Sequence, residues 1–97
     1  MRVIARRSLR EHWHRRPDSE QPLRAWFSEV RKASWRSPAD IKAVHRSASI
    51  LRGGRCVFNI AGNKYRLVVW INYPYRVVYI RFIGPHRQYD RIDAQTI

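Results

Sequence analysis

The chain has 97 residues, and 20 Lys and Arg against 7 Asp and Glu give it a formal net charge of +13. This length predicts a single domain over residues 1–97, because a second domain would be too small to form its own core. Twelve aromatic residues supply apolar surface for packing, and the low Gly and Pro content argues against disorder. A lone cysteine excludes an internal disulfide, and no apolar run approaches the roughly 18 residues of a membrane span.

Positive charge is spread along the whole chain, with six or seven basic side chains in each of residues 1–24, 25–55 and 56–97. Most of them are Arg, whose guanidinium binds phosphate in a bidentate manner and stacks on bases. A folded surface this positive predicts an anionic partner. We expect nucleic acid and no membrane, because no segment combines a clean apolar face with a basic one. The absence of a signal peptide predicts a cytoplasmic location.

The N-terminal half predicts a short strand at residues 1–5 followed by helices. The first helix spans Arg6–Arg16 and ends at Pro17. Asp18 and Ser19 are expected to cap the second helix. Apolar residues recur in that helix at i, i+3, i+4 and i+7: Leu23, Trp26, Phe27 and Val30. Ser37-Pro38 is typical of a helix start and predicts a short helix over Ala39–Val44.

The C-terminal half changes to a period of two, which is typical of strands. Strands are predicted at Cys56–Ile60, Tyr65–Asn72 and Arg76–Ile83, and Gly84-Pro85 is expected to break the last one. His86–Ala94 indicates a short closing helix or turn. Alternation in the third strand places Val78, Ile80 and Phe82 opposite Val77, Tyr79, Arg81 and Ile83. Helices followed by an antiparallel meander predict an α+β fold.

Several residues with reactive side chains have a structural interpretation. Cys56 is expected to be a buried strand residue and not a reactive thiol. His12 and His14 lie two apart on a helix, so they face different directions and are expected to be solvent-exposed. His45 is expected at a helix C-terminus, where a favourable interaction of its charge with the helix dipole explains its presence as well as a functional role would. No residue set predicts a metal or a cofactor.

Arg66 and Arg81 interrupt apolar strands, which predicts either a functional open face or a face that only meets water. Beside Arg66, the nearby His86, Tyr89 and Asp90 would form a compact set of titratable groups and one cation. RNA can be cleaved without metal when its 2′-hydroxyl attacks the adjacent phosphate. That reaction needs a base, an acid and a cation, and these side chains can supply all three.

Three ordered runs, Val57–Val69, Val78–Gly84 and His86–Ala94, closely resemble the HigB toxins of the RelE-like superfamily of bacterial toxin–antitoxin systems. A looser similarity extends through Ser37–Lys42 and Ser47–Ser49. The resemblance implies a RelE-like fold, with an N-terminal strand and a helical hairpin on a small antiparallel sheet. It also implies an mRNA interferase that cleaves translated messenger on the ribosome. A cognate antitoxin with a helix-turn-helix domain would inhibit it, and operator DNA would be bound only through that antitoxin.

The resemblance also implies site residues. Arg66 matches an arginine at the scissile phosphate, and His86, Tyr89 and Asp90 match further catalytic groups, although which is base and which is acid stays open. Lys64 matches a supporting cation. We expect it to bind RNA together with Arg55, Arg81 and Arg87. Ribosomal RNA is expected to meet the basic outer face of the first helix: Arg6, Arg7, Arg10, Arg15 and Arg16.

A non-catalytic module that binds RNA or the ribosome is the alternative. It would share the positive charge and the exposed aromatic residues, but it would not need the set of groups from His86 to Asp90. A purely structural partner domain would leave the charge of +13 unexplained.

Overall fold

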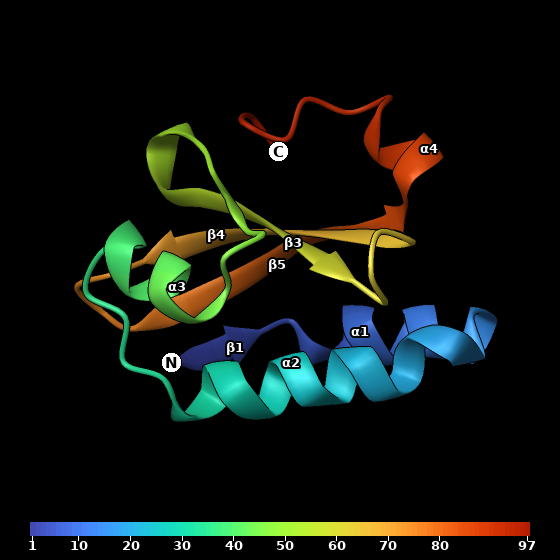
Figure 1. The fold of residues 1–97 in the computed structure, drawn as a ribbon, viewed down its shortest axis with the longest axis horizontal. Helices are drawn as coiled ribbons and strands as arrows, with labels where there is room; N and C mark the ends of the chain where they lie inside the picture. Colours follow the sequence, from blue (N-terminus) through green and yellow to red (C-terminus); the bar gives the residue numbers. More distant parts are fainter.

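The computed structural model describes residues 1–97 as a five-stranded sheet with two helices on one face and the C-terminal segment on the other (Figure 1). The strands are β1 (Arg2–Ile4), β2 (Ser49–Ile50), β3 (Arg55–Ile60), β4 (Tyr65–Asn72) and β5 (Val77–Pro85), in the spatial order β1-β5-β4-β3-β2. The helices are α1 (Arg6–Arg15), α2 (Glu20–Lys32), α3 (Pro38–Val44) and α4 (His86–Tyr89). The predicted α+β fold is confirmed, and none of the helices could cross a membrane.

The sheet is mixed and not wholly antiparallel. β1 lies at one edge and runs parallel to β5, with Val3 opposite Val78. The remaining neighbours, β2 to β5, form an antiparallel meander. Parallel strands need a long crossover connection. Here nearly the whole chain lies between β1 and β5 in the sequence, although the two strands are neighbours in the sheet. The short strand predicted at residues 1–5 is present at Arg2–Ile4, whereas its parallel direction had no signal in the local pattern.

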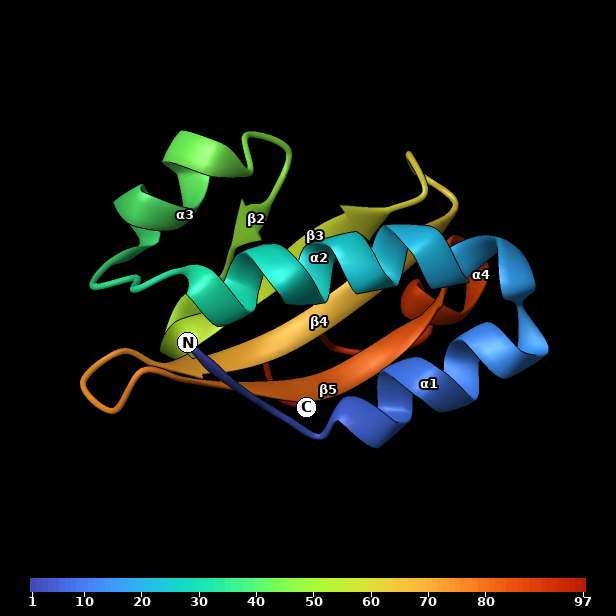
Figure 2. The same cartoon turned by 90° about the horizontal axis from the view of Figure 1, so that it is seen from below.

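The main core lies between the sheet and the pair α1–α2, which run side by side across one face (Figure 2). Leu23 and Val30 of α2 have no exposed surface, as their helical spacing predicts. Cys56 is also fully buried, in agreement with its predicted structural role. Burial raises the pKa of its thiol to about 12, so it is not a reactive nucleophile. β4 contributes the alternating side chains Tyr65, Leu67, Val69 and Ile71.

A second, smaller core covers part of the opposite face. Val57 and Val68 are buried there against Ala94, because the chain after α4 folds back over the sheet. Phe82 and Ile92 pack beside them. The sequence predicted a face that was open or met water, but this segment covers part of it and leaves the Arg66 side chain half-buried.

β5 contains a bulge that the strict alternation did not predict. Val69 pairs with Ile80, whereas Val68 pairs with Phe82, so Arg81 is left without a partner in the register. A β-bulge moves every later side chain to the opposite face. The predicted faces of Phe82 and Ile83 are therefore wrong: Phe82 joins the small core and Ile83 the main core.

The predicted strand break at Gly84-Pro85 is also wrong. β5 continues through both residues, with Gly84 opposite Arg66 and Pro85 opposite Tyr65. Proline is tolerated at a strand end, where its missing N–H need not pair. A Cβ on Gly84 would lie 2.8 Å from the Phe82 ring and 2.9 Å from Oε1 of Gln88, so any larger residue there would displace these two side chains.

The turn between α1 and α2 does not use the caps that were predicted. Residues 17–19 form a 3₁₀ turn, and neither Asp18 nor Ser19 caps α2 with its side chain. Ser19 Oγ instead donates to the carbonyl oxygen of Arg16 at 2.7 Å. The side chain of Asp18 reaches across to β4, where it binds Lys64 and Tyr65.

His12 is buried, which corrects its predicted exposure, whereas His14 is exposed as expected. The Nδ1 atom of His12 lies 2.9 Å from Ser19 Oγ, and its ring meets that of Tyr65 edge-on at 4.8 Å. The turn after α1 and the start of β4 together enclose the imidazole. Burial, and then the charge of Arg15, lower the pKa of His12.

Candidate active site

Arg66 lies in the middle of the sheet, between Asn59 of β3 and Gly84 of β5. Its guanidinium carbon is 6.0 Å from the centre of the Tyr89 ring, and its Nη1 atom is buried without a hydrogen-bond partner. A buried N–H group without an acceptor is costly. An incoming phosphate oxygen would satisfy it and would bind the guanidinium with a charge-assisted hydrogen bond.

The short helix α4 carries the other three candidate groups. His86 Nδ1 and Asp90 Oδ2 are 3.1 Å apart, one helical turn from each other. The carboxylate accepts the Nδ1–H of the imidazole, which leaves Nε2 available for exchange of a proton with a substrate. The His86 and Tyr89 rings meet edge-on with their centres 6.2 Å apart.

The register of β4 and β5 brings these groups together. Gly84 sits opposite Arg66, and α4 begins two residues later, so the helix starts beside the arginine. Contacts then run from Arg66 to Tyr89 and from Tyr89 to His86. The structure therefore places the four residues of the predicted constellation in one cluster. Each of them keeps enough freedom or exposure to meet a ligand.

Two of the predicted RNA-binding arginines have other contacts. Arg55 donates from Nε and Nη2 to the carbonyl oxygen of Ile97, at 3.2 and 2.9 Å, and so holds the C-terminal segment on the sheet. Arg81, in the bulge, stacks 5.7 Å from the ring centres of Trp70 and Tyr79. It remains exposed, but it contacts none of the four clustered residues.

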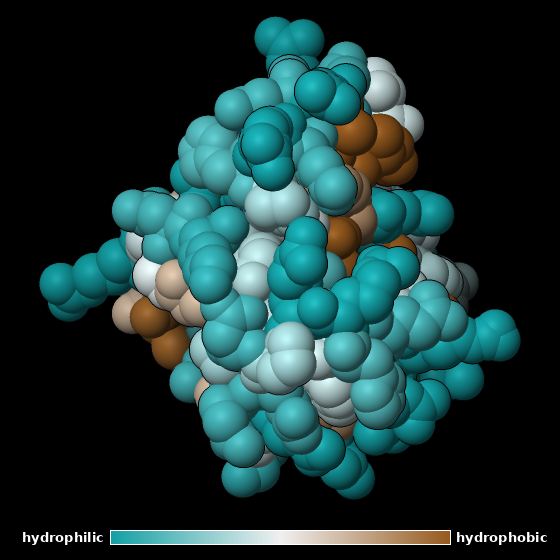
Figure 3. Space-filling model, turned by 90° about the vertical axis from the view of Figure 1, so that its right-hand side faces the viewer, coloured by the Kyte–Doolittle hydropathy of each residue, from teal (hydrophilic) through white to brown (hydrophobic).

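A basic trough lies beside the cluster, at the end of the molecule where α1, the β3–β4 turn and α4 meet. Two adjoining hollows of about 420 and 520 Å³ share Arg15, Arg16 and Pro85. Lys64 and Arg87 line the larger hollow. Figure 3 shows this end of the molecule, where hydrophilic side chains cover most of the surface. Residues predicted separately for RNA and ribosome binding thus form one continuous surface.

The remaining predicted ribosome contacts lie elsewhere on α1. Arg7 is exposed and lies 3.8 Å from Glu11. Arg6 and Arg10 line a groove between α1 and α2. The sheet separates this groove from α4, so the five arginines do not form one face.

A protein family described as HigB toxin, the RelE-like toxic component of a toxin–antitoxin system, matches residues 19–92. The chain belongs to the HigB toxin family. The mRNA interferase toxin HigB of Escherichia coli K12 is 27% identical over 96 residues, which cover 97% of this chain and 92% of that protein. The mRNA interferase HigB proteins of Escherichia coli O157:H7 and Shigella flexneri match to the same extent.

Membership of the HigB family makes this chain a toxin whose partner is an antitoxin. The resemblance in the sequence and the RelE-like fold are therefore confirmed. The matched residues include β4, β5 and α4, and so contain the whole cluster around Arg66.

The sequence did not predict the polar network that fixes the start of β4 in this HigB-family chain. Tyr65 Oη donates to Asp18 Oδ1 at 2.6 Å, and Lys64 forms an ion pair with the same carboxylate. The bonds from Lys64 and then Tyr65 lower the pKa of Asp18. No local pattern links residues 46 and 47 positions apart, so this network appears only in three dimensions.

Asp18→Asn is expected to lower the free energy of unfolding at neutral pH and to matter less in acid. The folded-state pKa of Asp18 lies below its unfolded value of about 3.9. The carboxylate therefore stabilises the fold above about pH 4, and this contribution is lost as the pH falls through the folded pKa. Urea unfolding at several pH values from 3 to 7 measures the difference between wild type and variant. An equal difference in the free energy of unfolding at all pH values would contradict this role. Glu11→Gln, at an exposed carboxylate, serves as the control.

Proposed function

We propose that this HigB-family toxin is an endoribonuclease that cleaves translated mRNA on the ribosome, with Arg66, His86, Tyr89 and Asp90 as its catalytic residues. The observation that carries the proposal is the unpartnered Nη1 of Arg66, whose guanidinium lies over the Tyr89 ring. The same ring contacts the His86 imidazole, which is itself paired with a carboxylate. A cation for charge and two groups for proton transfer are what RNA cleavage by its own 2′-hydroxyl requires. The printed names of the three relatives, all mRNA interferases, support the same activity.

The proposed reaction forms one bond and breaks one. The 2′-oxygen attacks phosphorus, and the bond from phosphorus to the 5′-oxygen breaks. The products carry a 2′,3′-cyclic phosphate and a 5′-hydroxyl. A base takes the proton of the 2′-hydroxyl and an acid protonates the 5′-oxygen. His86 Nε2 and the Asp90 carboxylate are the two groups for these transfers, in either order.

Arg66 and Tyr89 have roles that follow from their positions. The guanidinium is the cation of the cluster, 6.0 Å from the Tyr89 ring, so it would stabilise the negative charge that builds on the phosphate oxygens. The Tyr89 ring, half-buried between Arg66 and His86, offers a flat surface on which a base can stack.

The trough gives the RNA chain a place to bind on either side of the cleaved bond. Its four cations, Arg15, Arg16, Lys64 and Arg87, lie within two adjoining hollows next to α4. Phosphate contacts of this kind position an RNA strand without reading its sequence. The exposed Arg81 extends the positive surface along the sheet. Ribosomal RNA is a second polyanion that the same end of the molecule could contact.

The proposal also includes regulation by an antitoxin, as expected of a toxin–antitoxin system in the bacterial cytoplasm. The antitoxin would carry a helix-turn-helix domain, and the complex would reach operator DNA through that domain alone.

Mapping of messenger 5′ ends in a cell-free bacterial translation reaction tests this function. The protein should produce new ends at fixed positions relative to codons, and the ends should disappear when ribosomes are omitted. Cuts without ribosomes would indicate a free ribonuclease. Tight RNA or ribosome binding with no cuts would instead establish the non-catalytic binding module.

A further inference from the structure

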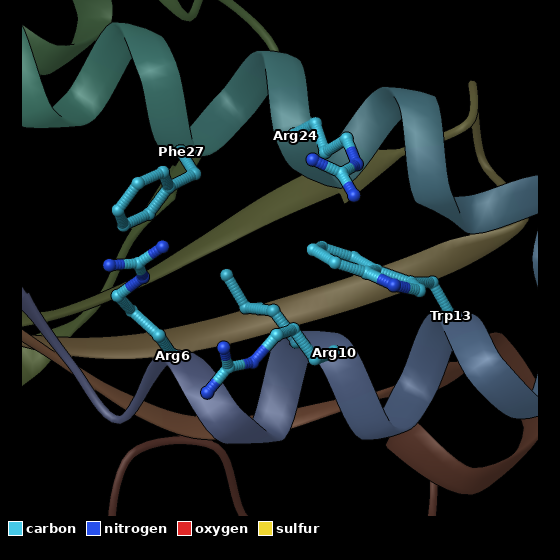
Figure 4. Close-up of a pocket in the computed structure, with 6 residues that line it drawn as sticks. Arg6, Arg10, Trp13, Arg24 and Phe27 are labelled. Carbon is cyan, nitrogen blue, oxygen red and sulfur yellow. The ribbon is translucent and has the colours of Figure 1, made fainter.

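The groove between α1 and α2 has a composition unlike the rest of the basic surface. Figure 4 shows its side chains: Arg6, Arg10 and Trp13 rise from α1, and Arg24 and Phe27 descend from α2. Leu9, which is buried, completes the lining. Three guanidinium groups thus surround an apolar pocket, and no carboxylate lines it.

Two cation–π contacts hold two of the three arginines of the groove, Arg6 and Arg24, in place. The Arg6 guanidinium lies 4.5 Å from the centre of the Phe27 ring, and that of Arg24 lies 4.8 Å from the centre of the Trp13 ring. Such contacts order long side chains before any partner binds. Arg24 has one carboxylate partner, Glu20 at 2.8 Å, whereas Arg6 and Arg10 have none. Arg6 and Arg10 therefore lie over the apolar surface of the groove without a carboxylate partner.

We infer that this groove is the docking site for an acidic segment of the antitoxin, in which an apolar side chain is flanked by Asp or Glu. The apolar side chain would enter the pocket between Trp13 and Phe27, and the carboxylates would bind Arg6 and Arg10. The inference rests on membership of the toxin–antitoxin family and not on the proposed catalytic residues.

The chemistry of the groove favours a protein segment over RNA. The arginines already cover one face of each aromatic ring, which leaves less ring surface on which a base could stack. A carboxylate can instead bind the free N–H edges of a stacked guanidinium without moving it. A pocket of about 170 Å³ is smaller than the roughly 300–1,000 Å³ of small-molecule sites and suits one apolar side chain. Arg and aromatic residues are also the side chains that dominate binding energy at protein interfaces.

The groove lies on the helical side of the sheet, whereas α4 and the C-terminal segment lie on the other side (Figure 1). Substitutions of the residues that line the groove therefore leave the Arg66 cluster intact. This separation allows antitoxin binding and RNA cleavage to be measured independently on the same protein.

The test compares two double variants with equal loss of charge. Arg6→Ala with Arg10→Ala removes both unpaired cations of the groove, and Arg7→Ala with Arg31→Ala removes two exposed cations that do not line it. The ligand is the cognate antitoxin, titrated by calorimetry. We expect the groove variant to bind at least tenfold more weakly and the control to stay within twofold of wild type. Alanine is a strong helix former, and thermal unfolding verifies that both variants fold.

Hydrogen exchange on the wild-type complex gives an independent readout. Bound antitoxin should protect the backbone amides of residues 6–13 and 24–27 more than those of α3, which does not line the groove. Equal affinities of the two double variants, or no protection there, would overturn the inference. Loss of ribosome binding or of self-association by the groove variant, with unchanged antitoxin affinity, would also overturn it and would assign the groove to RNA or to a second copy.

Discussion

Arg66→Ala is expected to reduce RNA cleavage by about 100- to 1,000-fold, which is the usual cost of removing one group that stabilises charge in a transition state. The residue is the only cation in contact with Tyr89, and its Nη1 has no partner within the protein. Alanine removes the guanidinium from a half-buried position and leaves the strand pairing of β4 unchanged. Single-turnover cleavage on programmed ribosomes measures the effect.

Arg81→Ala is the matched control for this substitution. Arg81 is a second arginine of the same sheet, but it is exposed in the β5 bulge and stacks on Trp70 and Tyr79. We expect a loss of a few-fold at most, through weaker RNA binding. A similar loss for both variants would mean that Arg66 contributes only general positive charge.

His86→Ala is expected to reduce cleavage by roughly 100- to 10,000-fold, the range that general acid–base catalysis contributes. The imidazole is exposed, so its removal creates no cavity, and RNA binding should remain near the wild-type level. Asp90→Asn removes the second proton-transfer group together with the carboxylate 3.1 Å from the ring, so we expect a loss of similar size. Affinity for a cleavage-resistant RNA, measured beside the rate, separates catalysis from binding.

Gln88→Ala is the control on the same helix. Gln88 is uncharged and lines the trough beside His12, outside the cluster, so we expect its variant to lose cleavage only a few-fold at most, through weaker RNA binding. Unchanged cleavage by His86→Ala would remove the imidazole from the proposed mechanism. Loss of RNA binding equal to the loss of rate would make His86 a binding residue.

Much of the fold could be predicted because its elements carry strong local patterns. β4 has the predicted bounds, and α2 buries three of the four residues whose spacing indicated a helix, namely Leu23, Trp26 and Val30. The errors occur where distant parts of the chain meet. A one-residue bulge at Arg81 places Phe82 and Ile83 on the faces opposite to those predicted, and Phe82 packs there in the small core that contains Val68.

The residues of the candidate site could be predicted from the sequence, but the contacts between them could not. The sequence brings His86, Tyr89 and Asp90 close together, whereas their contact with Arg66 depends on the pairing of β4 with β5. Burial of His12 depends on Ser19 and Tyr65, which surround it only after the chain has folded. The predicted RNA contact of Arg55 had a competing partner, the carbonyl of Ile97, that no local pattern indicates.

The chemistry of the cut ends tests the central claim most directly. Ribosomes are programmed with a messenger that carries one 2′-deoxynucleotide at the mapped cleavage position, and an all-ribose messenger is the control. The account predicts that the control yields 2′,3′-cyclic phosphate and 5′-hydroxyl ends, and that the substituted messenger stays intact at that position. Cleavage of the substituted messenger, or ends with a 5′-phosphate, would contradict attack by the 2′-hydroxyl at the Arg66 cluster.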